Sequence, residues 1–521
     1  MTERLSALDV SFLYLEEPTT PMHVGAVGIF APPKAGFDYD RLVKLIKGRI
    51  ALVPRYRQRV RWVPGGLAYP VWVDDEAFDV TYHVRRSALP RPGTEAQLRD
   101  LVGRIMSRPL DATRPLWEMY LVEGLEGGRY AIISKTHYAM IDGVNALDIG
   151  QVILDWEPEP RQVYQDEWSP AREPSGLQLV SKAVGDLVRS PANAVDSVRR
   201  SASDLSRTAA RVGRSVAGLA AAAVTVARPT PASPLNTEIG EQRRYGTAKI
   251  RLADLKEIRN AHGGTINDVV LAIVSGALRA WLMTRGEAVN QRSTVRAMVP
   301  VSVRAPEAVG TAIADGHQVA AFLLDLPVGE PDPVVRLQRI SFDMAQHKES
   351  GQMLGADAIV SIAGFAPPTL HALGARASSA LSKRVYNLIV TNVPGPQAPL
   401  YAGGGLLLAS YPVIPLSKGQ AVSIGLTSYN GGVYFGLNAD RDAMPDIDVL
   451  AQCLDDAAIE LAEASHPMRR TPPTSLAAAP KRPPKKQAAP RRKSTATASS
   501  PAISPATEPR ESTRLPGPPA G

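Results

Sequence analysis

The stretch RYAIISKTHYAMIDG, residues 129–143, indicates the fold of this chain more clearly than any other. Its first half is a short apolar run that follows a glycine pair at 127–128, which is typical of a strand entered through a tight turn. The polar segment THYAMIDG (136–143) begins where that strand ends, and Gly143 permits a sharp change of direction. The stretch therefore predicts a strand that delivers polar side chains to the edge of a sheet.

His137 and Asp142 are weak evidence of a site by themselves, because a single histidine at a strand end is more often structural than catalytic. The other seven histidines lie singly along the chain, at positions 23, 83, 262, 317, 347, 371 and 466. Their spacing predicts no metal site.

Outward from this stretch, the pattern of apolar residues predicts two α/β units. In residues 1–175 we expect strands at 24–30, 116–123 and 129–135 and helices at 39–52 and 96–107. In residues 245–466 we expect helices at 266–285, 334–349 and 446–464, strands at 247–252, 296–303, 318–326 and 387–392, and paired strands near 405–437.

Residues 176–244 separate the two units, and as far as residue 228 they are rich in Ala, Ser, Val and Arg with apolar residues at helical spacing. A helical crossover is the plain interpretation. An amphipathic helix on a lipid surface is a compatible alternative, because arginines at 200, 207, 211 and 214 partly share a face. The most apolar part, 216–227, is shorter than the roughly 20 residues that span a bilayer, so we expect any membrane contact to be peripheral.

The net charge of +8 belongs to the tail at 467–521, which holds eleven Lys and Arg against two Glu. The rest of the chain is close to neutral, which argues against a basic nucleic-acid-binding face. The tail is rich in proline and has no aromatic residue, so we expect it to be disordered. A solubilising tail and electrostatic contact with acidic lipid or nucleic acid both stay open. A single cysteine, Cys453, and no recognisable secretory signal fit a cytoplasmic protein.

Several separated segments resemble the bacterial wax ester synthase/diacylglycerol acyltransferase family, in the same order and over about 460 residues. The segments are LSALDVSFLYLEEPTTPMHVG (5–25), VPRYRQRV (53–60), RPLDATRPLWEMYLVEGLEGGRYA (108–131), THYAMIDG (136–143), TINDVVLAIVSGALRAWL (265–282), VPVSVR (299–304), NLIVTNVPGP (387–396) and FGLNADRDAMPD (435–446). Each block alone is modest, but together they are specific.

The resemblance implies two α/β domains like chloramphenicol acetyltransferase, with a tunnel between them. It implies an O-acyltransferase that uses acyl-CoA as substrate, with no metal or redox cofactor, to esterify diacylglycerol, a long-chain alcohol or both. In the family motif HHxxxDG, the second histidine deprotonates the acceptor hydroxyl, the aspartate fixes the loop and the glycine allows the turn.

This chain departs from the motif at the position of the base. Counting back from Asp142 and Gly143, the base position falls on Tyr138, and His137 matches the first histidine, which is usually not catalytic. Tyrosine has a reference pKa of about 10 and is mainly a proton donor at neutral pH. Because neighbouring side chains on a strand point to opposite faces, His137 would need a local bulge or turn to take over. The predicted catalytic set is His137, Tyr138, Asp142 and Gly143.

The resemblance also marks residues for substrate binding, each with a plainer alternative. Pro115, Leu116 and Trp117 line the substrate channel or form a packed strand entry. Asn267 and Asp268 belong to the active site or begin a helix, since both types favour N-caps. Asn392 belongs to the site or to a turn after a strand.

Three functions follow as hypotheses. The first is an active acyltransferase of triacylglycerol biosynthesis or wax ester synthesis, cytoplasmic and peripheral at the inner membrane or lipid droplets. The second is a catalytically impaired relative that binds acyl-CoA or neutral lipid. The third is transfer to another acceptor or a condensation domain of peptide synthesis. The segments Pro115–Trp117, Asn267–Asp268 and NVPGP (392–396) argue against the condensation domain.

Overall fold

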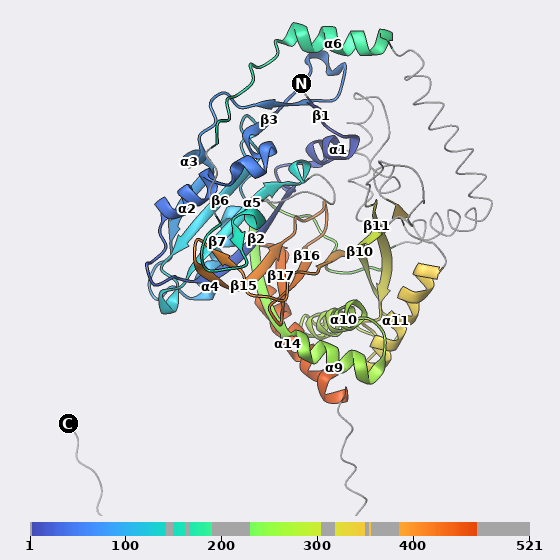
Figure 1. The fold of residues 1–521 in the computed structure, drawn as a ribbon. Coiled ribbons are helices and arrows are strands. Elements are labelled where there is room, and N and C mark those ends of the chain that lie inside the picture. Colours follow the sequence, from blue (N-terminus) through green and yellow to red (C-terminus); the bar gives the residue numbers. More distant parts are fainter. Residues whose placement is uncertain are drawn as a thin grey trace, which may run out of the picture. The chain divides into compact units, whose positions relative to one another are not determined.

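Two seven-stranded sheets carry the fold in the computed structural model of the protein, which describes residues 3–141, 149–161, 166–189, 230–303, 318–349, 354–355 and 385–465 (Figure 1). The first sheet has the order β5 (Val84–Ala88), β6 (Trp117–Glu123), β7 (Tyr130–His137), β2 (His23–Ala31), β15 (Gly405–Val413), β14 (Tyr401–Ala402) and β8 (Leu154–Asp155). The second has the order β12 (Leu354–Gly355), β11 (Gln318–Leu326), β10 (Val295–Val303), β13 (Leu388–Val393), β16 (Val422–Tyr429), β17 (Gly432–Asp440) and β9 (Arg243–Arg251). A small sheet joins β1 (Glu3–Arg4), β4 (Val71–Asp74) and β3 (Gln58–Arg61).

Both large sheets mix parallel and antiparallel pairs. In the first sheet β5 is parallel to β6, and in the second β13 is parallel to both β10 and β16. Strand β17, which lies between β16 and the edge strand β9, is buried along its whole length. The predicted mixed α/β fold is therefore confirmed.

The helices begin at recognisable capping residues. Capping boxes open α1, α4 and α10, with Ser6, Thr94 and Thr265 as the respective N-caps. The helices are α1 (Ala7–Leu15), α2 (Tyr39–Lys47), α3 (Val80–His83), α4 (Glu95–Met106), α5 (Ile149–Val152), α6 (Gly176–Arg189), α9 (Leu252–His262), α10 (Ile266–Thr284), α11 (Pro333–Glu349) and α14 (Ile447–Ser465). Short 3-10 turns are η1 (Ile50–Leu52), η2 (Pro54–Arg57), η3 (Pro64–Gly66), η4 (Glu126–Gly128) and η5 (Tyr138–Met140).

The predicted helix at 39–52 is wrong at its end. Helix α2 ends at Lys47 and Gly48 caps it, so Ile50–Leu52 forms the separate turn η1. Glycine has the weakest helix propensity after proline, which explains why the apolar spacing does not carry the helix further.

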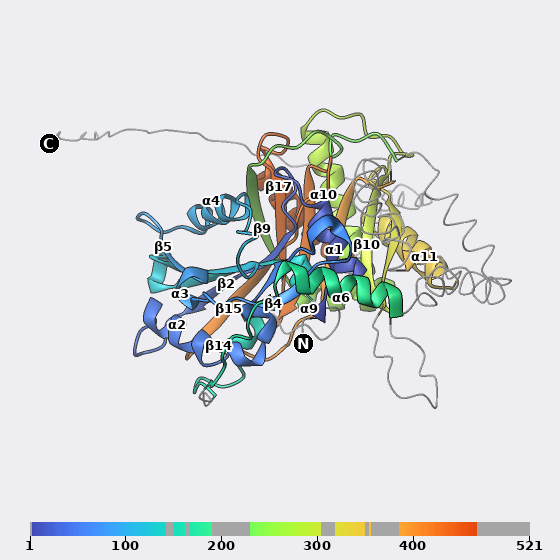
Figure 2. The same ribbon diagram turned by 90° about the horizontal axis from the view of Figure 1, so that it is seen from above.

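The helices of the C-terminal half gather on one side of the second sheet, where α10 packs against α9, α11 and α14 (Figures 1 and 2). Among the described helices, α10 alone is long and apolar enough to cross a membrane. However, 72% of its most apolar window is buried inside the fold. It therefore packs as the core helix of this half.

The two halves share strands. Residues 401–413, from the C-terminal part of the chain, form β14 and β15 and pair within the first sheet, where β15 lies antiparallel to β2. The hydroxyl of Tyr245 in β9 donates to the carbonyl oxygen of Pro412 in β15 at 2.8 Å. The predicted boundary at residue 245 assigns β14 and β15 to the C-terminal half, although both strands pair within the first sheet. Residues 1–467 form one compact unit.

Helix α6 begins where the crossover is predicted. Its Leu179 and Ala183 pack on Val63, Val71 and Val73 of the N-terminal half. Most of the remaining crossover and the predicted disordered tail at 467–521 lie outside the described residues.

Candidate active site

The end of strand β7 is held by its two neighbours in the first sheet. The backbone N–H of His137 donates to the carbonyl oxygen of Leu116 at 3.0 Å, and that of Tyr138 donates to Met22 at 2.9 Å. Directly across the β2–β7 ladder, His23 is the register partner of His137. Because residues opposite each other in a ladder share a face, both imidazoles lie on the same side of the sheet.

His137 is fully buried, and both of its ring nitrogens face polar groups. Its Nδ1 accepts a hydrogen bond from the backbone N–H of Ala139 at 3.0 Å, so the side chain caps the turn η5. Its Nε2 lies 3.5 Å from Oε2 of Glu16, at the outer limit of a hydrogen bond. Nδ1 is therefore occupied by the backbone, whereas Nε2 has no hydrogen-bond partner among the described residues.

Glu16, the residue that follows helix α1, lies between the two histidines. Its Oε1 is 3.1 Å from Nε2 of His23 and accepts from the backbone N–H of Met22 at 3.2 Å. Burial opposes ionisation of this carboxyl, but hydrogen bonds from His137 and His23 outweigh burial and hold its pKa well below its usual range. Burial lowers the pKa of His23 to about 4, although Glu16 pulls it the other way.

A donor and an acceptor both face Nε2 of His23, since the backbone N–H of Leu110 points at it from 3.4 Å and the carboxylate of Glu16 lies 3.1 Å away. The carboxylate is closer and charged, so the Nε2–H tautomer, which donates to Glu16, is the better assignment. That tautomer leaves Nδ1 of His23 buried without a hydrogen-bond partner among the described residues.

Tyr138 points away from this cluster. Its ring stacks on Phe12 of α1 with centroids 5.1 Å apart and an interplanar angle of 22°. The side chain is half-buried, and burial raises the pKa of its hydroxyl to about 12. At neutral pH Tyr138 is therefore a proton donor, which is the opposite of what a general base must be.

Lys135 lies on the same face of β7 as His137 and is fully buried. Its Nζ donates to the carbonyl oxygens of Ile105, at 3.1 Å, and Arg108, at the C-terminal end of α4. Burial lowers the pKa of Lys135 to about 8, and the carboxylate of Glu118, 4.0 Å away, partly offsets this. The ammonium group anchors α4 to the strand that carries the motif.

The predicted segment Pro115–Trp117 forms the entry to β6. Leu116 and Trp117 are buried, and the indole N–H of Trp117 donates to the carbonyl oxygen of Tyr56 at 2.8 Å. The ring of His83 stacks on the indole with centroids 4.7 Å apart. These contacts are those of a packed strand entry, and through its carbonyl Leu116 also fixes His137.

The predicted pair Asn267 and Asp268 lies at the start of α10, but neither residue is its N-cap. Thr265 is the N-cap, and Asp268 at the third helical position completes a capping box by accepting from the backbone N–H of Thr265 at 2.8 Å. Asn267 accepts from the side-chain amide of Asn392 at 3.2 Å. The structure thus brings these three residues together at the second sheet, whereas His137 and Tyr138 belong to the first.

Asp142 and Gly143 lie outside the described residues, so their predicted roles stay predictions. Sequence reasoning missed Glu16 and His23. The register of β2 against β7 and the acid at the end of α1 are the signals that identify them, and both depend on long-range pairing.

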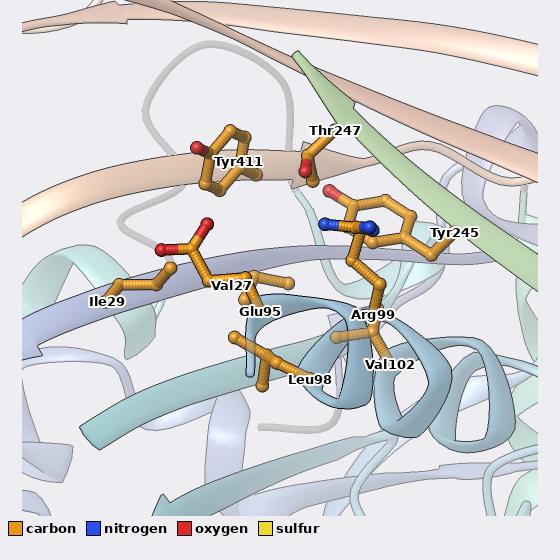
Figure 3. Close-up of a pocket in the computed structure, with 9 residues that line it drawn as sticks. All are labelled: Val27, Ile29, Glu95, Leu98, Arg99, Val102, Tyr245, Thr247 and Tyr411. Atoms are coloured by element: carbon orange, nitrogen blue, oxygen red, sulfur yellow. The ribbon is translucent and has the colours of Figure 1, made fainter. Parts of the chain in front are cut away.

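A small hollow opens between α4, β2, β9 and β15, with about 230 Å³ of empty space that includes open solvent (Figure 3). It is lined by Val27, Ile29, Glu95, Leu98, Arg99, Val102, Tyr245, Thr247 and Tyr411. Val27 lies four residues along β2 from His23, which is ~13 Å on an extended strand. The hollow is therefore separate from the histidine cluster, and a tunnel between the halves stays a prediction.

Two segments of the chain match known family domains. Residues 5–270 match the wax ester synthase/diacylglycerol acyltransferase catalytic domain, and residues 315–462 match the C-terminal domain of the same family. The chain belongs to this acyltransferase family. That Tyr138 stands at the position of the second histidine of the family motif stays a prediction.

Curated relatives agree with this membership. The probable diacylglycerol O-acyltransferase tgs3 of Mycobacterium tuberculosis is 46% identical over 263 residues, which are 50% of this chain and 96% of that protein. The probable diacylglycerol O-acyltransferase tgs2 of the same organism is 33% identical over 458 residues, which are 88% of this chain and 98% of that protein.

Solved structures agree in fold. A wax ester synthase/diacylglycerol acyltransferase from Marinobacter aquaeolei VT8 superposes with a TM-score of 0.64 at 27% identity, covering 89% of this chain and 99% of that one. The starter condensation domain of rhizomide synthetase has a TM-score of 0.53 at 14% identity, covering 89% of this chain and 96% of that one. The second likeness concerns the fold alone.

The family uses acyl-CoA as its acyl donor. Within the described ranges, no group of three or more histidine, cysteine, aspartate or glutamate side chains is placed to hold a metal ion.

Proposed function

We propose that this protein is an acyl-CoA-dependent O-acyltransferase that esterifies diacylglycerol to triacylglycerol, with a long-chain alcohol as a second acceptor. The observation that carries the proposal is the match to tgs2, because it runs through 88% of the chain and 98% of that relative. The Marinobacter structure extends the support to wax ester synthesis, since its name includes both activities.

In the proposed reaction the acceptor hydroxyl oxygen attacks the thioester carbonyl of acyl-CoA. A C–O bond forms, the C–S bond breaks, and the hydroxyl proton leaves with CoA as its thiol. A hydroxyl is a poor nucleophile at neutral pH, so a group that takes its proton in the transition state accelerates the step. Hydrogen-bond donors near the carbonyl oxygen stabilise the charge that develops there.

The test is turnover of the purified full chain with palmitoyl-CoA and either diacylglycerol or hexadecanol. We expect triacylglycerol to form in step with release of the CoA thiol, and wax ester to form with hexadecanol. CoA release without ester would mean thioester hydrolysis, and ester from hexadecanol alone would remove diacylglycerol as the acceptor.

Tyr138 favours a second candidate, a protein that binds acyl-CoA or neutral lipid without turning it over. A hydroxyl whose pKa is raised to about 12 by burial cannot accept a proton at neutral pH. Saturable binding of palmitoyl-CoA together with no ester or CoA release in the same assay would favour this candidate over the enzyme.

We further propose that the protein works in the cytoplasm and contacts the inner membrane or lipid droplets peripherally through α6. One side of this helix packs on the fold, while Leu177 and Val184 on another side are 84% and 46% exposed. Exposed apolar side chains on a helix favour an interface with lipid.

We expect replacement of Leu177 and Val184 by serine to weaken cosedimentation with phosphatidylglycerol vesicles severalfold, because less apolar area enters the lipid. Met283→Ser is the matched control, since Met283 is 55% exposed at the end of α10. An equal loss in the control, or no loss in the double variant, would contradict contact through α6.

A further inference from the structure

The carboxylate of Glu16 joins two histidines that come from neighbouring strands of the first sheet. One oxygen faces Nε2 of His23 at 3.1 Å and the other faces Nε2 of His137 at 3.5 Å. Both imidazoles are buried, whereas the side chain of Glu16 is 28% exposed. The rings of His23 and His137 meet edge to face with centroids 6.0 Å apart. The three side chains form one polar cluster at the ends of β2 and β7.

The contacts of His137 select one tautomer. Its Nδ1 must carry a lone pair, because the backbone N–H of Ala139 points at it from 3.0 Å. A neutral imidazole with a lone pair on Nδ1 carries its proton on Nε2. That proton lies on the nitrogen 3.5 Å from Oε2 of Glu16, a contact between a polar N–H and a carboxylate charge rather than a hydrogen bond, since Nε2 has no hydrogen-bond partner among the described residues. The Glu16 charge and the Ala139 N–H thus favour the same protonation state of His137.

The tautomer matters because His137 is the cap of η5, the turn that carries Tyr138. Nδ1 of His137 holds the N–H of Ala139, while Met22 holds the N–H of Tyr138 from the other side. The ring of Tyr138 is then directed onto Phe12 of α1, and Glu16 directly follows the same helix. A change of tautomer at His137 would therefore release the turn that carries residue 138.

We propose that Glu16 is a positioning residue of the acyltransferase site, which holds His137 as its Nε2–H tautomer and thereby fixes the turn that presents residue 138. This inference rests on the proposed function for its kinetic consequence. Its structural part, the tautomer of His137, is independent of turnover.

Substitution by glutamine shows why a carboxylate is required. A glutamine has one acceptor oxygen and one donor NH₂ group, so it can accept from only one of the two histidines. If the NH₂ group faces His137, that ring must move its proton to Nδ1 to present a lone pair. Nδ1–H would then face the N–H of Ala139, and the cap of η5 would be lost.

Glu17→Gln is a matched control one residue away. The carboxylate of Glu17 pairs with Nζ of Lys418 at 2.8 Å, so its substitution removes the same charge from the same segment. The neighbouring Lys135, whose charge acts on both Glu16 and His23, is unchanged in either variant. Any effect shared by both variants is therefore a general effect of charge.

The experiment combines histidine NMR with kinetics on the full chain. With ¹⁵N-labelled histidine, we expect His137 of the native protein in the Nε2–H form, and Glu16→Gln to change its ring ¹⁵N shifts. We also expect Glu16→Gln to lower kcat about tenfold with KM nearly unchanged, since a charge-assisted contact orients the site. Glu17→Gln should match the native protein in both readouts.

An Nδ1–H tautomer in the native protein would overturn the proposal, as would unchanged ring shifts in Glu16→Gln or equal kinetic losses in the two variants. If the native protein shows no turnover, the proposed function fails, and the NMR result still decides whether Glu16 sets the tautomer. If Glu16→Gln does not fold, Glu16→Asp gives the same comparison with the carboxylate withdrawn by one methylene group.

Discussion

Replacement of Tyr138 by histidine is expected to raise the rate of ester formation by about 10²–10⁴-fold, the usual contribution of a general base. The resemblance to the family motif predicts the base at position 138, and this chain has a phenol there with a pKa raised to about 12 by burial. An imidazole has a reference pKa near 6.5 and accepts protons at neutral pH. It is also smaller than a phenol, so we expect it to fit beside Phe12.

Tyr138→Phe is the control for this gain. It keeps the aromatic stack on Phe12 and removes only the hydroxyl. Initial rates with palmitoyl-CoA and diacylglycerol are compared for the native protein and both variants. A native rate that Tyr138→His does not increase would mean that another group already supplies the base. A loss in Tyr138→Phe would show that the tyrosine hydroxyl itself takes part, as a donor to the carbonyl oxygen.

Most elements of the fold could be predicted from local sequence. Strands β7 and β10 and helices α4, α10 and α14 lie within two residues of their predicted bounds. Their apolar periodicity and capping residues are local signals, and both survive in the packed structure. The family could also be predicted from local sequence, because each resembling segment is a short run of neighbouring residues.

Long-range pairing could not be predicted in this way. The apolar run at 405–413 has the pattern of a strand, but nothing local states that it pairs with β2 of the other half. The same limit applies to the site: His23 and Glu16 are near His137 only because β2 pairs with β7 and α1 ends beside them. Both residues lie in the family-like segment 5–25, but that resemblance assigns neither of them a role.

The structure distinguishes two roles that His137 could have, a general base and the cap of the turn η5. As a base, His137 would need a nitrogen that faces the acceptor hydroxyl. As a cap, it needs only an acceptor atom near the position of Nδ1 to hold the N–H of Ala139. Asparagine has such an acceptor and is among the best capping residues, whereas alanine has none.

We therefore expect His137→Ala to lower kcat/KM by about 10–100-fold, since a buried N–H without its acceptor costs about 1–3 kcal/mol and loosens the turn at Tyr138. His137→Asn should retain most of the native rate. Urea unfolding of both variants checks that the fold is kept. If His137→Asn and His137→Ala both fold and abolish turnover equally, His137 acts as the base, because neither asparagine nor alanine can take a proton. If His137 acts only as a cap, His137→Asn should be more active than His137→Ala.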